Sequence, residues 1–153
     1  MTSAIPSYPP VMHPFHLAFP VTNLSEARAF YGELLGCPEG RSSEDWVDFN
    51  LCGHQIVAHK VSAFSAEQES SDVDGHLVPV RHFELVLPLE EWEALVCRLD
   101  ERGVSYLIKP CLRFEGTPGA QQTLFLRDPS GNALEFKSML NPEALFTRFD
   151  EQG

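Results

Sequence analysis

The chain has 153 residues, and 22 acidic side chains against 11 basic ones give it a formal net charge of −11. This length accommodates one compact domain or two very small ones, and the composition, with 43% hydrophobic and 22% charged residues, is that of an ordinary globular protein. The acid excess argues against nucleic acids and anionic membrane surfaces as partners. Because the sequence also contains neither a long apolar run nor a secretory signal pattern, we expect a cytoplasmic protein.

The first half of the chain is predicted to form a strand, a helix and further strands. Apolar residues alternate along the first strand and leave His16 on the opposite face. Asn23 provides an N-cap for the helix, and Gly36 supplies its left-handed end. The predicted segments are a strand at 15–21, a helix at 24–34, a turn-forming stretch at 37–43, and strands at 46–51 and 55–61.

The same order of elements begins again after a polar, acidic stretch. In the first strand of this second half, His82 and Glu84 face away from the apolar residues that alternate with them. A D-P-S-G turn precedes the last strand. The predicted segments are a strand at 80–87, a helix at 89–102, strands at 105–108, 122–127 and 133–138, and a short helix at 142–149.

This internal duplication predicts an α+β fold with two tandem βαβββ modules. The modules are expected to form a curved mixed sheet around a central cavity, with the helices on the outside. The expected divisions are an N-terminal tail at 1–12, a first module at 13–61, a linker at 62–78, a second module at 79–139, and a C-terminal helix and tail at 140–153.

Three side chains with metal-binding chemistry lie at notable places in the repeat. His16 and His82 occupy matching positions in the two first strands, and Glu135 lies in the last strand of the second half. If the halves pair around a pseudo-twofold axis, these three residues converge. Two imidazoles and one carboxylate with open positions form the facial triad that suits Fe²⁺ and also accepts Mn²⁺, Ni²⁺ or Zn²⁺.

Three segments carry a resemblance to a known family: F-H-L-A-F-P-V-T-N-L-S-E-A-R-A-F-Y-G-E-L-L-G at 15–36, R-H-F-E-L-V-L at 81–87 and L-F-L-R-D-P-S-G-N-A-L-E-F at 124–136. They resemble the vicinal oxygen chelate superfamily, which includes glyoxalase I, type I extradiol dioxygenases, fosfomycin-resistance proteins and methylmalonyl-CoA epimerase. The resemblance implies His16, His82 and Glu135 as ligands of a divalent metal, with Fe²⁺ favoured. It also implies a homodimer, in which the modules pair within or across chains.

The number of protein ligands separates the branches of this superfamily. Glyoxalase I and the epimerase add a fourth ligand from the last strand of the first module, where Gln55, Val57 and His59 share a face. Aligning the two repeats places Val57 at the position of Glu135, and a valine cannot bind metal. The resulting three-ligand set resembles the dioxygenases, although a shifted register would bring in Gln55 or His59 instead.

Other residues complete the predicted site around a small-molecule substrate. Glu84 and His59 are candidates for acid/base catalysis, and they gain importance because Phe125 replaces the tyrosine of the dioxygenase pattern and no histidine lies between 110 and 124. Trp46, Phe114 and Phe125 are candidate pocket walls, and Arg113 is a candidate partner for a substrate carboxylate. The leading hypothesis is an extradiol-dioxygenase-related oxidoreductase, and the alternatives are a glyoxalase-like lyase or isomerase and a resistance protein that sequesters a compound without catalysis.

Overall fold

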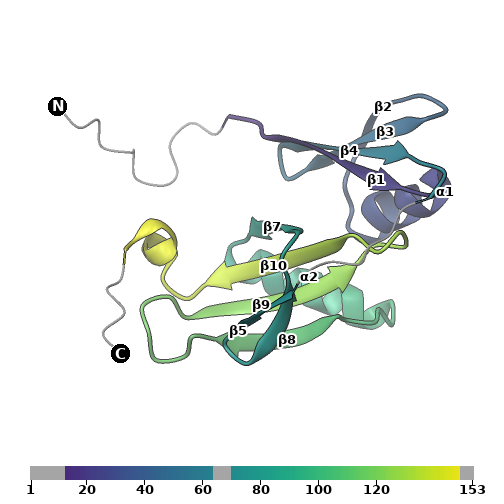
Figure 1. Cartoon of the computed structure of the whole chain (residues 1–153). Coiled ribbons are helices and arrows are strands. Elements are labelled where there is room, and N and C mark those ends of the chain that lie inside the picture. The colour runs from purple at the N-terminus through teal and green to yellow at the C-terminus, as the bar shows by residue number, and fades with distance from the viewer. Residues whose placement is uncertain (1–12, 64–69, 149–153) are drawn as a thin grey trace.

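The computed structural model describes residues 13–63 and 70–148. The first module contains β1 (His16–Val21), α1 (Leu24–Ala27), η1 (Arg28–Leu34), β2 (Glu39–Ser42), β3 (Trp46–Leu51) and β4 (His54–Lys60). Its four strands form one sheet in the order β1-β4-β3-β2, in which β1 pairs in parallel with β4 (Figure 1). β1 is therefore an edge strand of this sheet.

The second module repeats the topology of the first. Its elements are β7 (His82–Val86), α2 (Leu89–Glu101), β8 (Ile108–Arg113), β9 (Gln121–Arg127) and β10 (Ala133–Met139), followed by the 3₁₀ helix η2 (Pro142–Phe146). The strands form a second sheet in the order β7-β10-β9-β8, with β7 parallel to β10 and at the open edge. The predicted α+β class with two βαβββ modules is confirmed.

A small hairpin lies between the modules in sequence. β5 (Ser70–Val73) and β6 (His76–Pro79) pair antiparallel around a turn at Asp74 and Gly75, and both turn residues have positive φ. Arg113 Nη2 donates to the carbonyl of Val73 over 3.2 Å, and the backbone N–H of Phe114 donates to Asp74 Oδ2 over 2.9 Å. The described part of the predicted linker at 62–78 thus contains ordered strands that are fastened to the end of β8.

Two further stretches of secondary structure differ from the prediction. β2 occupies part of the stretch at 37–43 that was predicted to be a turn. All four of its residues are exposed, so no apolar alternation marks it as a strand. β8 begins at Ile108, where the strand predicted at 105–108 ends. A shift in its pairing with β9 between Ile108 and Cys111, next to Pro110, interrupts the alternation that would reveal it in the sequence.

The first helix begins and ends as its sequence predicts. Asn23 Oδ1 accepts a hydrogen bond from the backbone N–H of Glu26 over 3.0 Å, and Gly36 has φ of 76°. The helix changes from α to π hydrogen bonding at Arg28, which places the consecutive residues Phe30 and Tyr31 both in the core. Across 13–63 and 70–148, none of the helices is long and apolar enough to cross a membrane.

One hydrophobic core joins the two modules. It contains residues of β1, α1, η1, β3 and β4 together with residues of α2, β9 and β10. The rings of Phe19 on β1 and Phe83 on β7 lie 5.4 Å apart between their centroids. Because side chains alternate along a strand, His16 and His82 lie on the faces of the two sheets that are turned away from this core.

Buried polar contacts also fasten the modules together. The Tyr31 hydroxyl donates to Asp128 Oδ2 over 2.8 Å, and Asn132 Nδ2 donates to the carbonyl of Pro20 over 2.8 Å. Asp128 in turn accepts from the backbone N–H of Asn132 over 2.8 Å, so the D-P-S-G turn holds its shape around this carboxylate. The relative placement of the modules thus depends on specific hydrogen bonds as well as on apolar packing.

Candidate functional site

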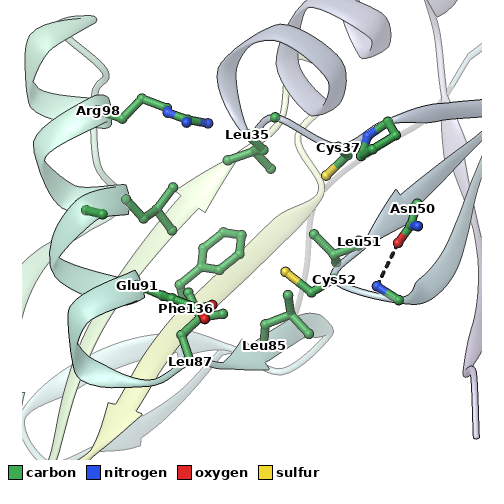
Figure 2. Close-up of a pocket in the computed structure, with 15 residues that line it drawn as sticks. Leu35, Cys37, Asn50, Leu51, Cys52, Leu85, Leu87, Glu91, Arg98 and Phe136 are labelled. Carbon is green, nitrogen blue, oxygen red and sulfur yellow. Dashed lines mark hydrogen bonds between the residues drawn. The ribbon is translucent and has the colours of Figure 1, made fainter. Parts of the chain in front are cut away.

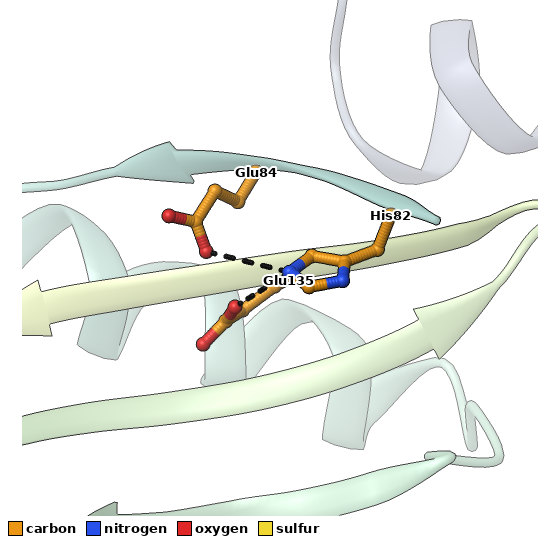
Figure 3. A group of neighbouring side chains, drawn as sticks. All are labelled: His82, Glu84 and Glu135. Atoms are coloured by element: carbon orange, nitrogen blue, oxygen red, sulfur yellow. Dashed lines mark ion pairs between the residues drawn. The ribbon is translucent and has the colours of Figure 1, made fainter. Parts of the chain in front are cut away.

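His82, Glu84 and Glu135 form a compact group on the face of the second sheet that is turned away from the core (Figure 3). His82 and Glu84 lie two residues apart on β7, and the strand register places Glu84 directly beside Glu135 on β10. One ligand atom from each of the three side chains lies within 4.8 Å of the others. An imidazole and two carboxylates at this spacing suit a divalent cation.

A hydrogen bond at Nδ1 fixes the orientation of the His82 ring. Its Nδ1 lies 2.7 Å from the carbonyl oxygen of Pro79, which can only accept a hydrogen bond, so Nδ1 carries a proton. Nε2 then faces the carboxylates, 3.3 Å from Glu135 Oε2 and 4.0 Å from Glu84 Oε2. The hydrogen bond with Glu135 raises the pKa of His82, partly offset by burial, so proton and metal compete for Nε2.

Glu135 is held as a carboxylate despite its burial. Its side chain is 5% exposed, and Thr123 Oγ1 donates a short hydrogen bond to Oε1. Burial alone raises the pKa of this group, but hydrogen bonds from His82, Glu84 and Thr123 outweigh burial and lower it to about 2. Arg113 Nη1 lies 3.8 Å from Oε1 and adds a positive charge nearby. An ionised carboxylate fixed in this way is ready to bind a cation.

The pKa of Glu84 is shifted in the opposite direction, upward. Burial and the neighbouring Glu135 raise its pKa to about 7, although Lys137 opposes this shift from 2.7 Å. Its side chain is 29% exposed, which leaves it in contact with solvent at the edge of the group. When two adjacent carboxyl groups have well separated pKa values, the group with the lower value stays charged and the other can carry a proton. Here these groups are Glu135 and Glu84.

His16 lies apart from this group within one chain. It is exposed on β1, and its Nδ1 lies 2.6 Å from Gln55 Oε1. The Gln55 amide also donates from Nε2 to Asp48 Oδ2 over 2.8 Å. The structure thus brings together two of the three predicted metal ligands, His82 and Glu135, and adds Glu84 to them.

The first module carries the apolar counterpart of the Glu135 position. Val57 pairs with Ala18 in the register in which Glu135 pairs with Glu84, as the repeat alignment predicts. His59 is exposed and lies opposite Trp46 on the sheet of the first module, so neither side chain belongs to the group around His82.

The other predicted pocket residues lie in the second module. Phe125 is fully buried, and its ring packs edge-on against His82 with 5.2 Å between centroids. Arg113 is 3% exposed, with its guanidinium 5.2 Å from the ring centroid of Phe114. Because its Nη1 lies 3.8 Å from Glu135 Oε1, Arg113 compensates the buried charge of Glu135. Thr123 was missed by the sequence reasoning, although its place opposite Lys137, diagonal to Glu135, puts it on the functional face.

Two hollows border the modules. A groove of about 470 Å³ runs between the edge strands β1 and β7, and His82 lines it together with Ala18 and Pro20. A separate cavity of about 500 Å³ lies between the modules on the core side, where Leu51, Leu85 and other apolar residues line it (Figure 2). The second cavity contains none of the predicted site residues.

The sequence of residues 13–136 matches the Glyoxalase/Bleomycin resistance protein/Dioxygenase superfamily. This match covers most of the chain, and the βαβββ repeat and the His82 group agree with it, so the chain belongs to this superfamily, which is the vicinal oxygen chelate superfamily predicted from its motifs.

Solved structures agree with this assignment. A glyoxalase/bleomycin resistance protein/dioxygenase from Alicyclobacillus acidocaldarius is 30% identical, with a TM-score of 0.76, over 88% of this chain and 96% of that one. An integron cassette protein from the mobile metagenome of the Halifax Harbour sewage outfall is 26% identical, with a TM-score of 0.63, over 84% of this chain and 100% of that one. The fosfomycin resistance protein FosX from Listeria monocytogenes is 16% identical, with a TM-score of 0.64 over 88% of this chain and 99% of that one, and shares the fold. No curated protein matches the sequence.

Proposed function

We propose that this chain is a metal-dependent enzyme that binds two adjacent oxygens of a small-molecule substrate at a centre made by His16, His82 and Glu135. The proposal depends on one observation: the two histidines make equivalent hydrogen bonds. Each has its Nδ1 held by a hydrogen-bond acceptor, Gln55 Oε1 at 2.6 Å for His16 and the Pro79 carbonyl at 2.7 Å for His82. Both rings therefore present Nε2 as the ligand atom, as metal-binding histidines do.

A second copy of the chain supplies His16 to the centre. β1 and β7 are open sheet edges that border a groove containing His82, and the described residues place no histidine of the first module in the His82 group. Edge strands are templates for pairing with another chain. If β1 of one copy lies beside β7 of the other, the partner's His16 approaches Glu135, and a symmetric dimer contains two such centres.

The residues around the metal ligands supply the charge and the proton transfer that the reaction needs. When bound, a divalent metal supplies positive charge that holds and stabilises oxygen atoms on the substrate. Glu135 contributes a permanent negative charge, since its pKa is about 2. Glu84, with a pKa of about 7, accepts or returns a proton next to the substrate. Phe125 supports the His82 ring from the buried side.

The leading reaction is ring cleavage of the extradiol-dioxygenase type, with Fe²⁺ as the metal. Val57 stands where a fourth protein ligand would come from, which leaves positions for both a chelating substrate and O₂. The second candidate is a glyoxalase-like lyase or isomerase, which needs a proton carrier rather than O₂. Glu84, a partly exposed carboxyl group within the His82 group, favours this candidate.

Metal analysis of protein purified without chelators tests the centre. We expect about one metal per chain, its loss in His82→Ala, and its retention in the matched control His13→Ala, which replaces an exposed histidine outside both sheets. Metal content that is unchanged in His82→Ala would overturn the proposal. Oxygen uptake with a panel of catechols, compared with hemithioacetal turnover, separates the two reactions, and a metal-free protein that binds compounds without turnover would indicate sequestration.

Complementation tests the shared centre. His16→Ala and Glu135→Ala each break every centre of their own homodimer. A mixed dimer of the two variants contains one intact centre if the partner supplies His16, and none if each chain uses its own. Co-expression with two affinity tags, followed by metal analysis of the mixed dimer, should recover about half of the metal content of the wild-type dimer. A mixed dimer without metal would refute the exchange.

A further inference from the structure

A buried carboxylate lies behind His16 on the sheet of the first module. Asp48 on β3 is 6% exposed, and its Oδ2 accepts from Gln55 Nε2 over 2.8 Å. Arg41 lies on its solvent side, with Nε 3.5 Å from the same oxygen. Burying a carboxylate is costly unless its oxygens are hydrogen-bonded. Asp48 is distant in sequence from the predicted ligands, and the site described above does not use it.

The contacts of Asp48 fix the orientation of the Gln55 amide. A carboxylate only accepts hydrogen bonds, so the atom of Gln55 that faces Asp48 must be the nitrogen, and the atom that faces His16 must be the oxygen. An amide oxygen in turn only accepts, and at 2.6 Å it requires a proton on His16 Nδ1. The neutral ring is then left with its lone pair on Nε2.

We propose that Asp48 and Gln55 are positioning residues that set the tautomer and ring orientation of His16, so that Nε2 is the atom offered to the metal. The hydrogen bonds that run from Asp48 through Gln55 to His16 are called the relay below. This inference rests on the proposed function, because the relay affects metal binding only if His16 is a ligand. It also assigns Gln55 a role other than metal ligand, since both ends of its amide are engaged. In the second module, the backbone carbonyl of Pro79 accepts from Nδ1 of His82 and fixes its tautomer in the same way.

The tautomer can be measured directly in the metal-free protein. NMR of the full chain labelled with ¹⁵N-histidine, at a pH well above the ordinary imidazole pKa of about 6.5, distinguishes a protonated Nδ1 from a protonated Nε2. We expect a proton on Nδ1 of His16 in the wild type. In Asp48→Leu, Gln55 loses the acceptor that fixes its amide, so the amide is free to turn and the His16 proton is shared between Nδ1 and Nε2. The His82 signals should stay unchanged in both proteins.

A double variant separates this relay from simple disruption of the fold. In Asp48→Asn combined with Gln55→Glu, the new amide at position 48 donates to the new carboxylate at position 55, and that carboxylate again accepts from His16 Nδ1. We expect this protein to recover the wild-type tautomer. A proton on Nε2 of His16 in the wild type, or an unchanged tautomer in Asp48→Leu, would overturn the inference.

Zinc affinity, measured by competition with a chromophoric chelator, gives a second readout that needs no turnover. Loss of a hydrogen-bond partner behind a metal-binding histidine weakens affinity by about 10- to 100-fold, so we expect this loss in Asp48→Leu and recovery in the double variant. If the tautomer switches as expected but zinc affinity stays constant, His16 is not a ligand. That result would refute the His16 part of the proposed function and, with it, the metal-directed role of the relay.

Discussion

The buried hydrogen bond between Tyr31 and Asp128 is expected to contribute about 2 kcal/mol to the free energy of unfolding. The Tyr31 side chain is fully buried, Asp128 is 4% exposed, and the hydroxyl donates over 2.8 Å. A hydrogen bond to a charged group contributes about 1.5 to 3 kcal/mol. In Tyr31→Phe, Asp128 Oδ2 keeps one donor, Asn132 Nδ2 at 2.9 Å, so the loss should fall below the upper end of this range.

A matched exposed pair provides the control. Tyr106 donates to Asp100 Oδ1 over 2.7 Å, but this contact lies in solvent, where Tyr106→Phe should cost about 0.5 kcal/mol or less. Urea unfolding at pH 7 and one fixed protein concentration measures both losses, and Tyr31→Phe should also lower Tm by about 4 to 8 °C. Equal losses in the two variants would refute the argument that burial makes the contact between the modules strong.

Three further predictions concern the core and the helix ends. Burial raises the pKa of Cys37 to about 12 from an ordinary 9.0, so its stabilising effect is complete below pH 9 and is lost as the pH rises. Urea titrations should show a loss of about 1 kcal/mol between pH 9 and pH 10 that Cys37→Ala abolishes, and an equal slope in both proteins would contradict this. Gly36→Ala and Gly103→Ala, at φ of 76° and 65°, should each cost about 1 to 2 kcal/mol in thermal unfolding, whereas neutral substitutions would show that the helix ends relax. Trp92→Phe removes the donor that lies 2.9 Å from the buried Phe136 carbonyl and should cost about 1 to 3 kcal/mol by urea unfolding, and an unchanged midpoint would argue that the carbonyl finds another partner.

The fold was predictable where the sequence has strong periodicity. The duplicated order of elements, the Asn23 cap and the left-handed Gly36 each follow from local residue chemistry, and the structure has all three. β2 was not predictable in this way because an exposed edge strand has no buried face to mark it. The hairpin in the linker had one signal, the Asp74-Gly75 pair, which is typical of a tight hairpin turn.

The candidate site was predictable only within a module. Alternation along β7 and β10 is sufficient to place His82 and Glu135 on one face, and the register pairs Glu135 with Glu84, two residues from His82. In the proposed centre, the position of His16 depends on how two modules of two chains meet, which is a tertiary and quaternary property. The contribution of Asp48 was also hidden, because an acidic residue in an alternating strand normally indicates a solvated face, whereas this one is buried behind Gln55.

The contrast between Val57 and Glu135 bears on how such a protein evolves. A duplicated gene segment starts with two equal copies, and here the equivalent positions hold an apolar side chain in one copy and a buried carboxylate in the other. Only the second copy needs the charge for the proposed centre, so residues around Val57 can change without affecting it. New substrate contacts can therefore arise on the sheet of the first module without loss of the carboxylate that the second module retains.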